Sequence, residues 1–253
     1  MSNPWRLYDD LVDALPVGVR VEDCVLSRFA MVSTSVGGYG LALADRAGRR
    51  TLRDPESVVG RDLRSVASLA KSWDFELAAL GVAAMNSWFN TEQRVVDAGA
   101  TLIGADGDSF VVHAQRVAGR RVGVVGHFAG LRHLTAADEL IVLERDPHGD
   151  DYPDPACEYL LAGCDEVFIT GTAVANKTLP RLLELAADAR TVLVGPSTPF
   201  APEVYGSRVD EIGGAWVADA NLAGRLARMG ASMRSMKQVF TRFNASFDHG
   251  ANR

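Results

Sequence analysis

The chain has few cysteines, no long apolar run and no excess of basic residues, and each absence excludes a class of protein. Three cysteines in 253 residues, Cys24, Cys157 and Cys164, are too few for a disulfide framework. No apolar run reaches the roughly 18 to 20 residues of a membrane span, and no signal-peptide pattern opens the chain. We therefore expect a cytoplasmic protein with buried, reduced thiols and no membrane partner.

The charge balance argues against nucleic acid as a partner. The chain carries 26 basic and 32 acidic residues, a formal net charge of −6, whereas nucleic-acid binding requires a basic surface. The basic segment 225–242 is the one local exception, and an amphipathic, solvated helix explains it more simply.

Several catalytic signatures are also absent. The sequence contains no HExxH motif and no P-loop, and Ser197 lacks the GxSxG context of a nucleophilic serine. His113, His133 and His249 have no ligand-like spacing, so we expect each to be a surface or packed histidine. Hydrolysis through an activated serine and a zinc-protease site are therefore both disfavoured.

The first part of the chain, to about residue 95, predicts an α+β unit. Apolar residues at helical spacing predict a helix over 5–15, and a nearly all-apolar segment predicts a central helix over 73–89. A shorter helix is expected over 63–71. Strands are expected within 17–34 and over 41–44, on either side of a glycine-rich connection, Gly37-Gly38-Tyr39-Gly40.

From about residue 108 strands and helices alternate, which is typical of a parallel, Rossmann-like sheet flanked by helices. The expected strands are 122–125, 140–143, 167–169, 192–194 and 215–217. The expected helices are 109–117, 155–162, 179–187 and 229–243. We divide the chain into a domain over 1–95 and an α/β domain over 96–253.

Polar residues follow four of these strands, and ligands bind beyond the carboxyl ends of parallel strands. The segments are Gly126-His127-Phe128, Glu144-Arg145, Thr170-Gly171-Thr172 with Asn176, and Gly195-Pro196-Ser197-Thr198-Pro199. Their convergence predicts a binding site, with the long loop 145–155 as a candidate lid.

Individual residues in this group allow more than one interpretation. Glu144 lies 18 residues beyond Gly126, where Rossmann units place a ribose-binding acid, but it could equally bind a metal or an ammonium group, or pair with Arg145. The His127 imidazole also has two interpretations: it either faces the crevice or forms a hydrogen bond with the backbone. The glycine spacing is not GxGxxG, so the dinucleotide signal is weak. Asn176 and nearby threonines could simply cap a helix.

The same segments carry a resemblance to a known family. Leu143–Pro147, Asp165–Thr172 with Asn176 and Thr178, and Gly195–Pro199 resemble the bacterial and archaeal "putative heavy-metal chelation" domain family. The segment Glu76–Asn86 resembles the signature of the domain that precedes it, although Ser87 stands where that family usually has alanine. The resemblance implies an N-terminal domain like the capping domain of enolases, a Rossmann-like C-terminal domain and a cleft between them.

Carried onto this chain, the resemblance implies a specific set of cleft residues. They are Glu76 and Asn86 from the first domain, and His127, Glu144, Thr170, Thr172, Asn176, Ser197 and Thr198 from the second. The strand-end turns themselves add Gly126, Phe128 and Gly171 to the predicted site. His127 and Glu144 are the expected ligands if a divalent metal ion binds there.

Three functions follow from these observations. The first is binding or processing of a metal complex or a small metal-chelating metabolite such as a metallophore, which needs few protein ligands. The second is a biosynthetic enzyme that uses S-adenosylmethionine or NAD(P). The third is a dimeric scaffold whose polar strand ends are solvated turns. The apolar hairpin and tryptophan-containing helix of the first domain could supply a homodimer interface.

Overall fold

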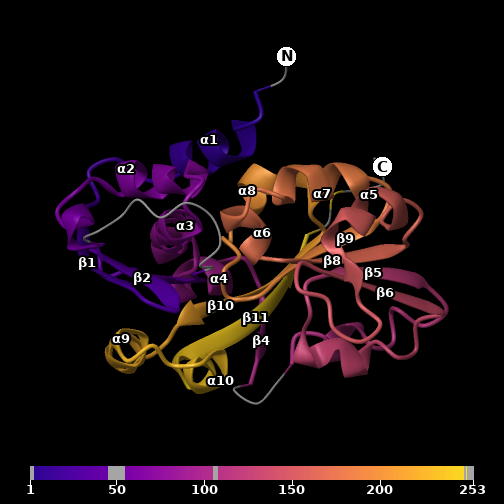
Figure 1. Cartoon of the computed structure of the whole chain (residues 1–253). Coiled ribbons are helices and arrows are strands. Elements are labelled where there is room, and N and C mark those ends of the chain that lie inside the picture. The colour runs from indigo at the N-terminus through magenta and orange to yellow at the C-terminus, as the bar shows by residue number, and fades with distance from the viewer. Residues whose placement is uncertain (1–2, 45–54, 105–107, 248, 250–253) are drawn as a thin grey trace.

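Two β-sheets organise the chain in the computed structural model, which describes residues 3–44, 55–104, 108–247 and 249 (Figure 1). The smaller sheet is antiparallel, in the order β1-β2-β3. Its strands are β1 (Val21–Leu26), β2 (Phe29–Thr34) and β3 (Tyr39–Leu43). The larger sheet has eight strands in the order β4-β11-β10-β9-β8-β5-β6-β7.

The helix α3 (Phe75–Phe89) covers one face of the small sheet and packs against its strands. Behind it lie α1 (Arg6–Asp13) and α2 (Leu63–Ala67), which continues as a 3-10 turn η2 (Ser68–Lys71); α2 and η2 pack on α3. The Asp74 carboxylate caps α3 by accepting the N–H groups of Glu76 and Leu77. These elements confirm the strands and helices expected for the first part of the chain.

The close contact between α3 and β3 depends on small residues. A Cβ atom on Gly40 would come within 2.0 Å of the Ala83 carbonyl oxygen, and one on Gly38 would come equally close to that of Ser87. Glycine at these two positions therefore lets the strand backbone lie directly against the helix.

Six neighbouring strands of the large sheet are parallel, which confirms the α/β class. The parallel strands are β5 (Arg121–Val125), β6 (Glu139–Glu144), β7 (Tyr152–Pro153), β8 (Glu166–Thr170), β9 (Arg190–Val194) and β10 (Glu211–Val217). Counted from β5 their order is 3-2-1-4-5-6, that of a doubly wound sheet, with the switch point between β5 and β8. Antiparallel β11 (Phe240–Ser246) and β4 (Thr101–Ile103) extend one edge.

Short helices connect these strands, and several of them lie along the upper side of the large sheet in Figure 1. The α-helices are α4 (Glu92–Asp97), α5 (Cys157–Leu160), α6 (Thr172–Ala175), α7 (Leu179–Leu185), α8 (Pro202–Tyr205), α9 (Ala220–Arg228) and α10 (Met233–Met236). The 3-10 segments are η1 (Pro55–Val58), η3 (Val111–His113), η4 (Ala129–His133), η5 (Asp154–Ala156), η6 (Gly206–Arg208) and η7 (Lys237–Val239). In the part of the chain that the structure describes, no helix is both long and apolar enough to span a bilayer.

The prediction of a helix over 109–117 was wrong. Only η3 forms there, within a series of tight turns that begins where the Asp108 carboxylate accepts the Phe110 N–H. Phe110, His113 and Val117 are buried together, as one helix face would be. The apolar spacing therefore identified the buried side chains but not the backbone, since the β-branched pair Val111-Val112 disfavours a helix.

The prediction of one long helix over 229–243 was also wrong. Gly230 has a φ of 65° and ends α9, Ser232 caps the short α10, and the chain then forms β11 against β10. The basic segment 225–242 is thus two short helices and the start of a strand. In the loop 145–155, two residues form β7 beside β6.

The C-terminal helices return to the small sheet and cover its other face. Val25, Phe29 and Met31 share one apolar cluster with residues of α9 and α10, and Figure 1 shows both helices below β1 and β2. The Ser27 hydroxyl also donates to the Ala227 carbonyl at 2.6 Å. The small sheet is therefore enclosed between α3 and the end of the chain.

Two buried asparagines join α3 to the large sheet. The Asn90 amide donates to the carbonyls of Thr198 at 2.8 Å and Ala215 at 3.0 Å, and its oxygen accepts the Phe200 N–H at 2.8 Å. One turn earlier, Asn86 donates to the Leu41 carbonyl at 2.9 Å and more weakly to that of Pro196. These bonds fix the C-terminal end of α3 against the segment after β9.

Replacing Asn90 with alanine should destabilise the protein by about 2–4 kcal/mol, because three buried backbone groups would lose their partner. The free energy of unfolding in urea measures this loss. Asn221→Ala, which removes an exposed asparagine, is the matched control. A cost for Asn90→Ala no greater than for the control would contradict the role of this joint.

A buried charged cluster lies at the opposite, amino-terminal ends of the parallel strands. Glu166, Arg190 and Glu211 begin β8, β9 and β10, and Arg116 contacts both carboxylates at 2.5–3.1 Å. His113 is completely buried beside them, with Nε2 3.4 Å from Glu211. Burial lowers the pKa of His113 to about 4. The cluster is therefore a stabilising network on the side of the sheet away from the ligand end.

Because folding lowers the pKa of His113, the unfolded chain binds a proton that the folded chain excludes. Stability should therefore fall as the pH drops below about 6.5, by about 2 kcal/mol from this residue between pH 7 and pH 5. His113→Gln should lose correspondingly less stability over that interval in urea titrations. His148→Gln, which replaces an exposed histidine, should retain the full loss; equal pH dependence in the wild type and His113→Gln would refute the assignment.

Candidate functional site

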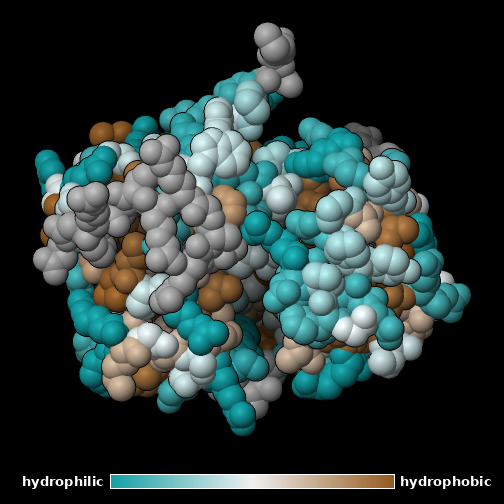
Figure 2. All heavy atoms as spheres, viewed as in Figure 1, coloured by the Kyte–Doolittle hydropathy of each residue, from teal (hydrophilic) through white to brown (hydrophobic). Residues whose placement is uncertain are grey.

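A cavity of about 1020 Å³ lies at the carboxyl ends of the parallel strands. Residues after β5, β6, β8 and β9 line it, and Leu43 of β3 and Phe75 of α3 line it from the side of the small sheet. Figure 2 shows the surface hollowed between these two parts of the molecule. The predicted crevice at the strand ends is therefore present, and both parts of the chain contribute to it.

Glycines form the turns at the base of this cavity. The N–H groups of Gly126, Gly171 and Gly195 each donate to the neighbouring strand at 2.8 Å, one residue beyond the end of their own strands. Gly126 and Gly195 then turn with φ values of 106° and 112°, which other residues rarely adopt. A Cβ atom on Gly171 would come 2.4 Å from the Thr198 hydroxyl, so glycine allows close packing there.

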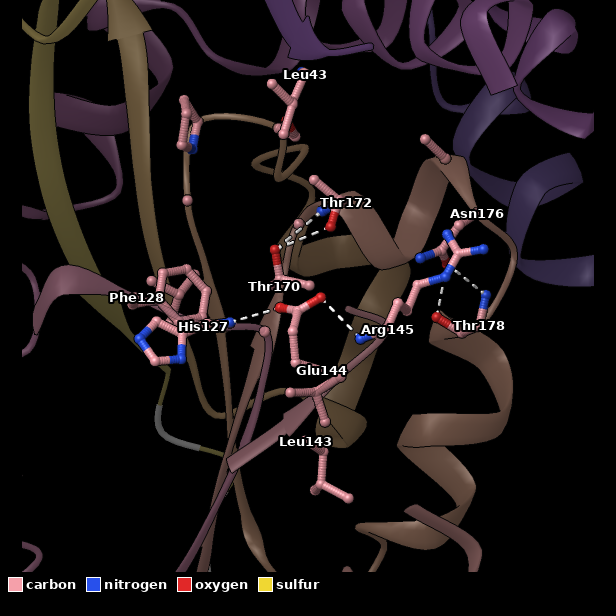
Figure 3. A pocket seen from close by; sticks show the side chains of 18 of the residues that line it. Leu43, His127, Phe128, Leu143, Glu144, Arg145, Thr170, Thr172, Asn176 and Thr178 are labelled. Atoms are coloured by element: carbon pink, nitrogen blue, oxygen red, sulfur yellow. Dashed lines mark hydrogen bonds between the residues drawn. The ribbon is translucent and has the colours of Figure 1, made fainter. Parts of the chain in front are cut away.

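Glu144 lies at the centre of the cavity and connects the ends of β5 and β6 (Figure 3). Its Oε2 accepts the backbone N–H of His127 at 2.8 Å, and its Oε1 accepts the backbone N–H of Arg145 at 2.8 Å. Glu144 therefore binds the backbone of Arg145 and does not form the ion pair with its side chain that the sequence also allowed. An ionised carboxylate can accept about four hydrogen bonds, so roughly two positions remain for a ligand.

The His127 imidazole does not join Glu144, and Figure 3 shows the ring pointing away from the carboxylate. The ring is 52% exposed, and its Nδ1 lies 2.8 Å from the Asp151 carboxylate in the loop that follows β6. Only the backbone N–H of His127 contacts Glu144. The expected pair of metal ligands is therefore not assembled by their side chains.

The donor set does not fit a metal ion held by the protein alone. Across the described residues, no three histidine, cysteine or carboxylate side chains come together as a candidate metal site. Structural zinc sites use four such ligands and catalytic sites three. Cys157 and Cys164 are buried, as expected, and burial raises the pKa of both thiols, which disfavours the thiolate that metals bind.

Hydroxyl and amide groups occupy the remaining strand ends. Thr170 and Thr172 hydrogen-bond to each other at 3.1 Å between their hydroxyl oxygens (Figure 3). Asn176 accepts both the N–H and the hydroxyl of Thr178, which forms a local turn before α7. The Ser197 hydroxyl accepts the N–H of Leu43 at 2.9 Å and so connects the small sheet to the cavity.

The predicted site residues divide into two groups. Those that line the cavity are Gly126, His127, Phe128, Glu144, Thr170, Gly171, Thr172, Asn176 and Ser197. Asn86, Thr198 and Glu76 are not among its lining residues; Asn86 and Thr198 are buried behind the surface, and Glu76 lies beside the lining residue Phe75. Asn86 acts in the joint between α3 and the large sheet, so its contribution to the site is indirect.

Lys177 lines the same cavity between α6 and α7, although it was not among the residues predicted from the sequence. Its Nζ lies 5.0 Å from the ring centre of Phe75 and 5.8 Å from that of Trp73, and it donates to the Ala175 carbonyl at 2.7 Å. Burial lowers its pKa to about 8. The short segment Asn176-Lys177-Thr178 carried no periodic signal, and the aromatic partners come from a region a hundred residues earlier in the chain.

Comparison with known proteins identifies the family. The family profile described as "Putative heavy-metal chelation" and called DUF364 matches residues 108–245. A second profile with the same description, DUF4213, matches residues 8–89. The chain belongs to this family. The description suggests a metal-related role, and it agrees with the resemblance seen in the strand-end segments.

Three relatives place the chain among proteins without a described activity. An uncharacterised protein of Methanocaldococcus jannaschii is 30% identical over 158 residues, and the match spans 58% of this chain and 57% of that relative. A DUF364 protein of unknown function from Desulfitobacterium hafniense is 32% identical, with a TM-score of 0.88 over 98% of this chain and 100% of its own. A DUF364 protein of unknown function from Pyrococcus horikoshii shares the fold at 19% identity, with a TM-score of 0.78 over 96% of this chain and 99% of its own.

Proposed function

We propose that the cavity binds a small metal-chelating metabolite, free or as its metal complex, and that the protein recognises mainly the organic part. The observation that carries this proposal is the contrast between a cavity of about 1020 Å³ and the lack of a three-ligand metal cluster among the described residues. The volume corresponds to a small-molecule site. A metal in such a complex obtains most of its ligands from the chelator.

The charges around the cavity support a ligand that carries carboxylates and amines. The basic lining residues come from both parts of the chain and are Arg28, Arg145, Lys177, Arg181, Lys237 and Arg242. Glu144 offers its remaining acceptor positions to an ammonium or hydroxyl group, and Thr170 and Thr172 add hydroxyls beside it. Polycarboxylate and amino-carboxylate chelators contain carboxylates together with hydroxyl or amine groups. One such ligand can therefore pair with the basic residues and also donate to Glu144.

A biosynthetic enzyme with a nucleotide cofactor is the second candidate. Its support is the 3-2-1-4-5-6 strand order, with Glu144 at the end of the strand where dinucleotide-binding units place the ribose-binding acid. Against a dinucleotide, Gly126 leads only to the five-residue 3-10 segment η4. A long helix there would supply the usual phosphate-binding N-terminus, so S-adenosylmethionine fits this alternative better than NAD(P).

Thermal unfolding of metal-stripped protein separates the two candidates. The panel contains citrate with and without Zn²⁺ or Fe³⁺, the metals alone, S-adenosylmethionine, S-adenosylhomocysteine, NAD(H) and NADP(H). A ligand present at 100 times its Kd stabilises the folded state by about 2.7 kcal/mol. We expect stabilisation by chelator or metal–chelator and none by nucleotides; the reverse pattern would replace the proposal with the second candidate.

Glu144→Gln tests whether the cavity is the binding site. The amide cannot accept every bond that the carboxylate accepts, so the affinity for the stabilising ligand should fall roughly 10–100-fold, the loss expected for a hydrogen bond to a charged group. Glu139→Gln removes the same charge from the other end of β6, where Glu139 pairs with Arg121, and should bind as the wild type does. Unchanged affinity in Glu144→Gln would place the ligand elsewhere.

A further inference from the structure

Lys177 has a backbone conformation that its side chain makes costly. Its φ is 68°, and it is the one non-glycine residue with a positive φ in the ranges that the structure describes. The position follows the C-terminal end of α6, where glycine or asparagine is the usual residue. Local strain of this kind concentrates at functional sites, so a lysine here calls for a functional explanation.

The surroundings of the Lys177 amine are apolar and lack an ion pair. Phe75 and Trp73 present their rings to it, and no carboxylate of the described residues lies within ion-pair distance of its Nζ. The charged group that acts on it is Asp74, whose carboxylate caps α3 and raises the pKa of the amine. Arg145 contacts the same Phe75 ring, with its guanidinium 5.5 Å from the ring centre. Desolvation activates a lysine as a nucleophile, and here burial outweighs the opposing charge of Asp74.

We propose that Lys177 is an amine nucleophile of the cavity, which forms an imine with the carbonyl group of a small aldehyde or keto acid. This step goes beyond the proposed binding function and requires no metal. It assigns to the cavity a covalent chemistry based on the amine of a residue that lines it.

The reaction balances without another reagent. The Nζ lone pair attacks the carbonyl carbon and forms a C–N bond, while the carbonyl π electrons move to oxygen, which takes up a proton. The carbinolamine then loses its hydroxyl group as water, and nitrogen releases its second hydrogen as the C=N bond forms. The products are one imine and one water molecule, and both hydrogens of that water derive from the neutral amine.

The protonation state at neutral pH supports this role. With a pKa of about 8, roughly a quarter of Lys177 is neutral at pH 7.5, against about a thousandth of an ordinary lysine. Arg145 on the same ring favours a substrate with a carboxylate next to the carbonyl group. The substrate class is therefore a small oxo acid.

The chain offers a clean test, because it contains three lysines, Lys71, Lys177 and Lys237. The full-length protein is incubated with glyoxylate and sodium cyanoborohydride, which reduces any imine to a stable carboxymethyl-lysine, and peptide mass spectrometry locates the label. We expect Lys177 to be labelled at least roughly tenfold faster than Lys71, which pairs with Asp9, or Lys237, with a half-maximal rate near pH 8. Equal rates at the three lysines would overturn the proposal.

Matched variants make the result specific. Lys177→Asn should fold, since asparagine tolerates a positive φ, and should lose the fast label, whereas Lys71→Arg, outside the cavity lining, should retain it. Arg145→Gln should reduce the preference for glyoxylate over the uncharged glycolaldehyde. Fast labelling of Lys71 or Lys237 would also refute the proposal. Because labelling needs neither metal nor chelator, its outcome is independent of the thermal-unfolding experiment.

Discussion

The junction between α3 and the segment after β9 is the constraint on which the rest of the structure depends. Asn86 and Asn90 stand one helical turn apart. The Asn90 amide binds carbonyls of the segment after β9 and of β10, and the Asn86 amide binds one carbonyl of β3 and one of the segment after β9. The two amide side chains place no charge in this buried region. Because their N–H groups point in fixed directions, the hydrogen bonds form in only one orientation of the helix. Since Gly38 and Gly40 hold β3 directly against the same helix, positioning α3 also positions the small sheet.

That constraint determines where the cavity lies and which residues face it. Phe75 at the start of α3 and Leu43 at the end of β3 are brought to the carboxyl ends of the parallel strands, and the Ser197 hydroxyl accepts the Leu43 N–H across the boundary. The cavity is thus a consequence of how the two sheets are joined.

The sequence predicted the elements whose side chains repeat regularly and missed those fixed by single residues. The parallel strands, α3 and the polar groups at the strand ends followed from apolar runs and the turns after them. The residues over 109–117 repeat like a helix yet form turns around the short η3, since the β-branched pair Val111-Val112 disfavours a helix. Over 229–243 one helix was expected where Gly230 and Ser232 separate two short helices from β11. The contact between Phe75 and Lys177 joins residues far apart in the sequence, so no local sequence pattern predicts it.

Most polar side chains at the strand ends are already committed to holding the backbone. Glu144 accepts two main-chain N–H groups, Ser197 accepts another, and Asn176 closes a turn with Thr178. Such groups can orient a ligand with their remaining lone pairs, but they cannot move or change charge without loosening the turns. Lys177 is different, because its amine contacts aromatic rings and a single carbonyl oxygen. A site built in this way separates positioning from reactivity, with fixed strand ends to hold a ligand and one adaptable amine to react with it.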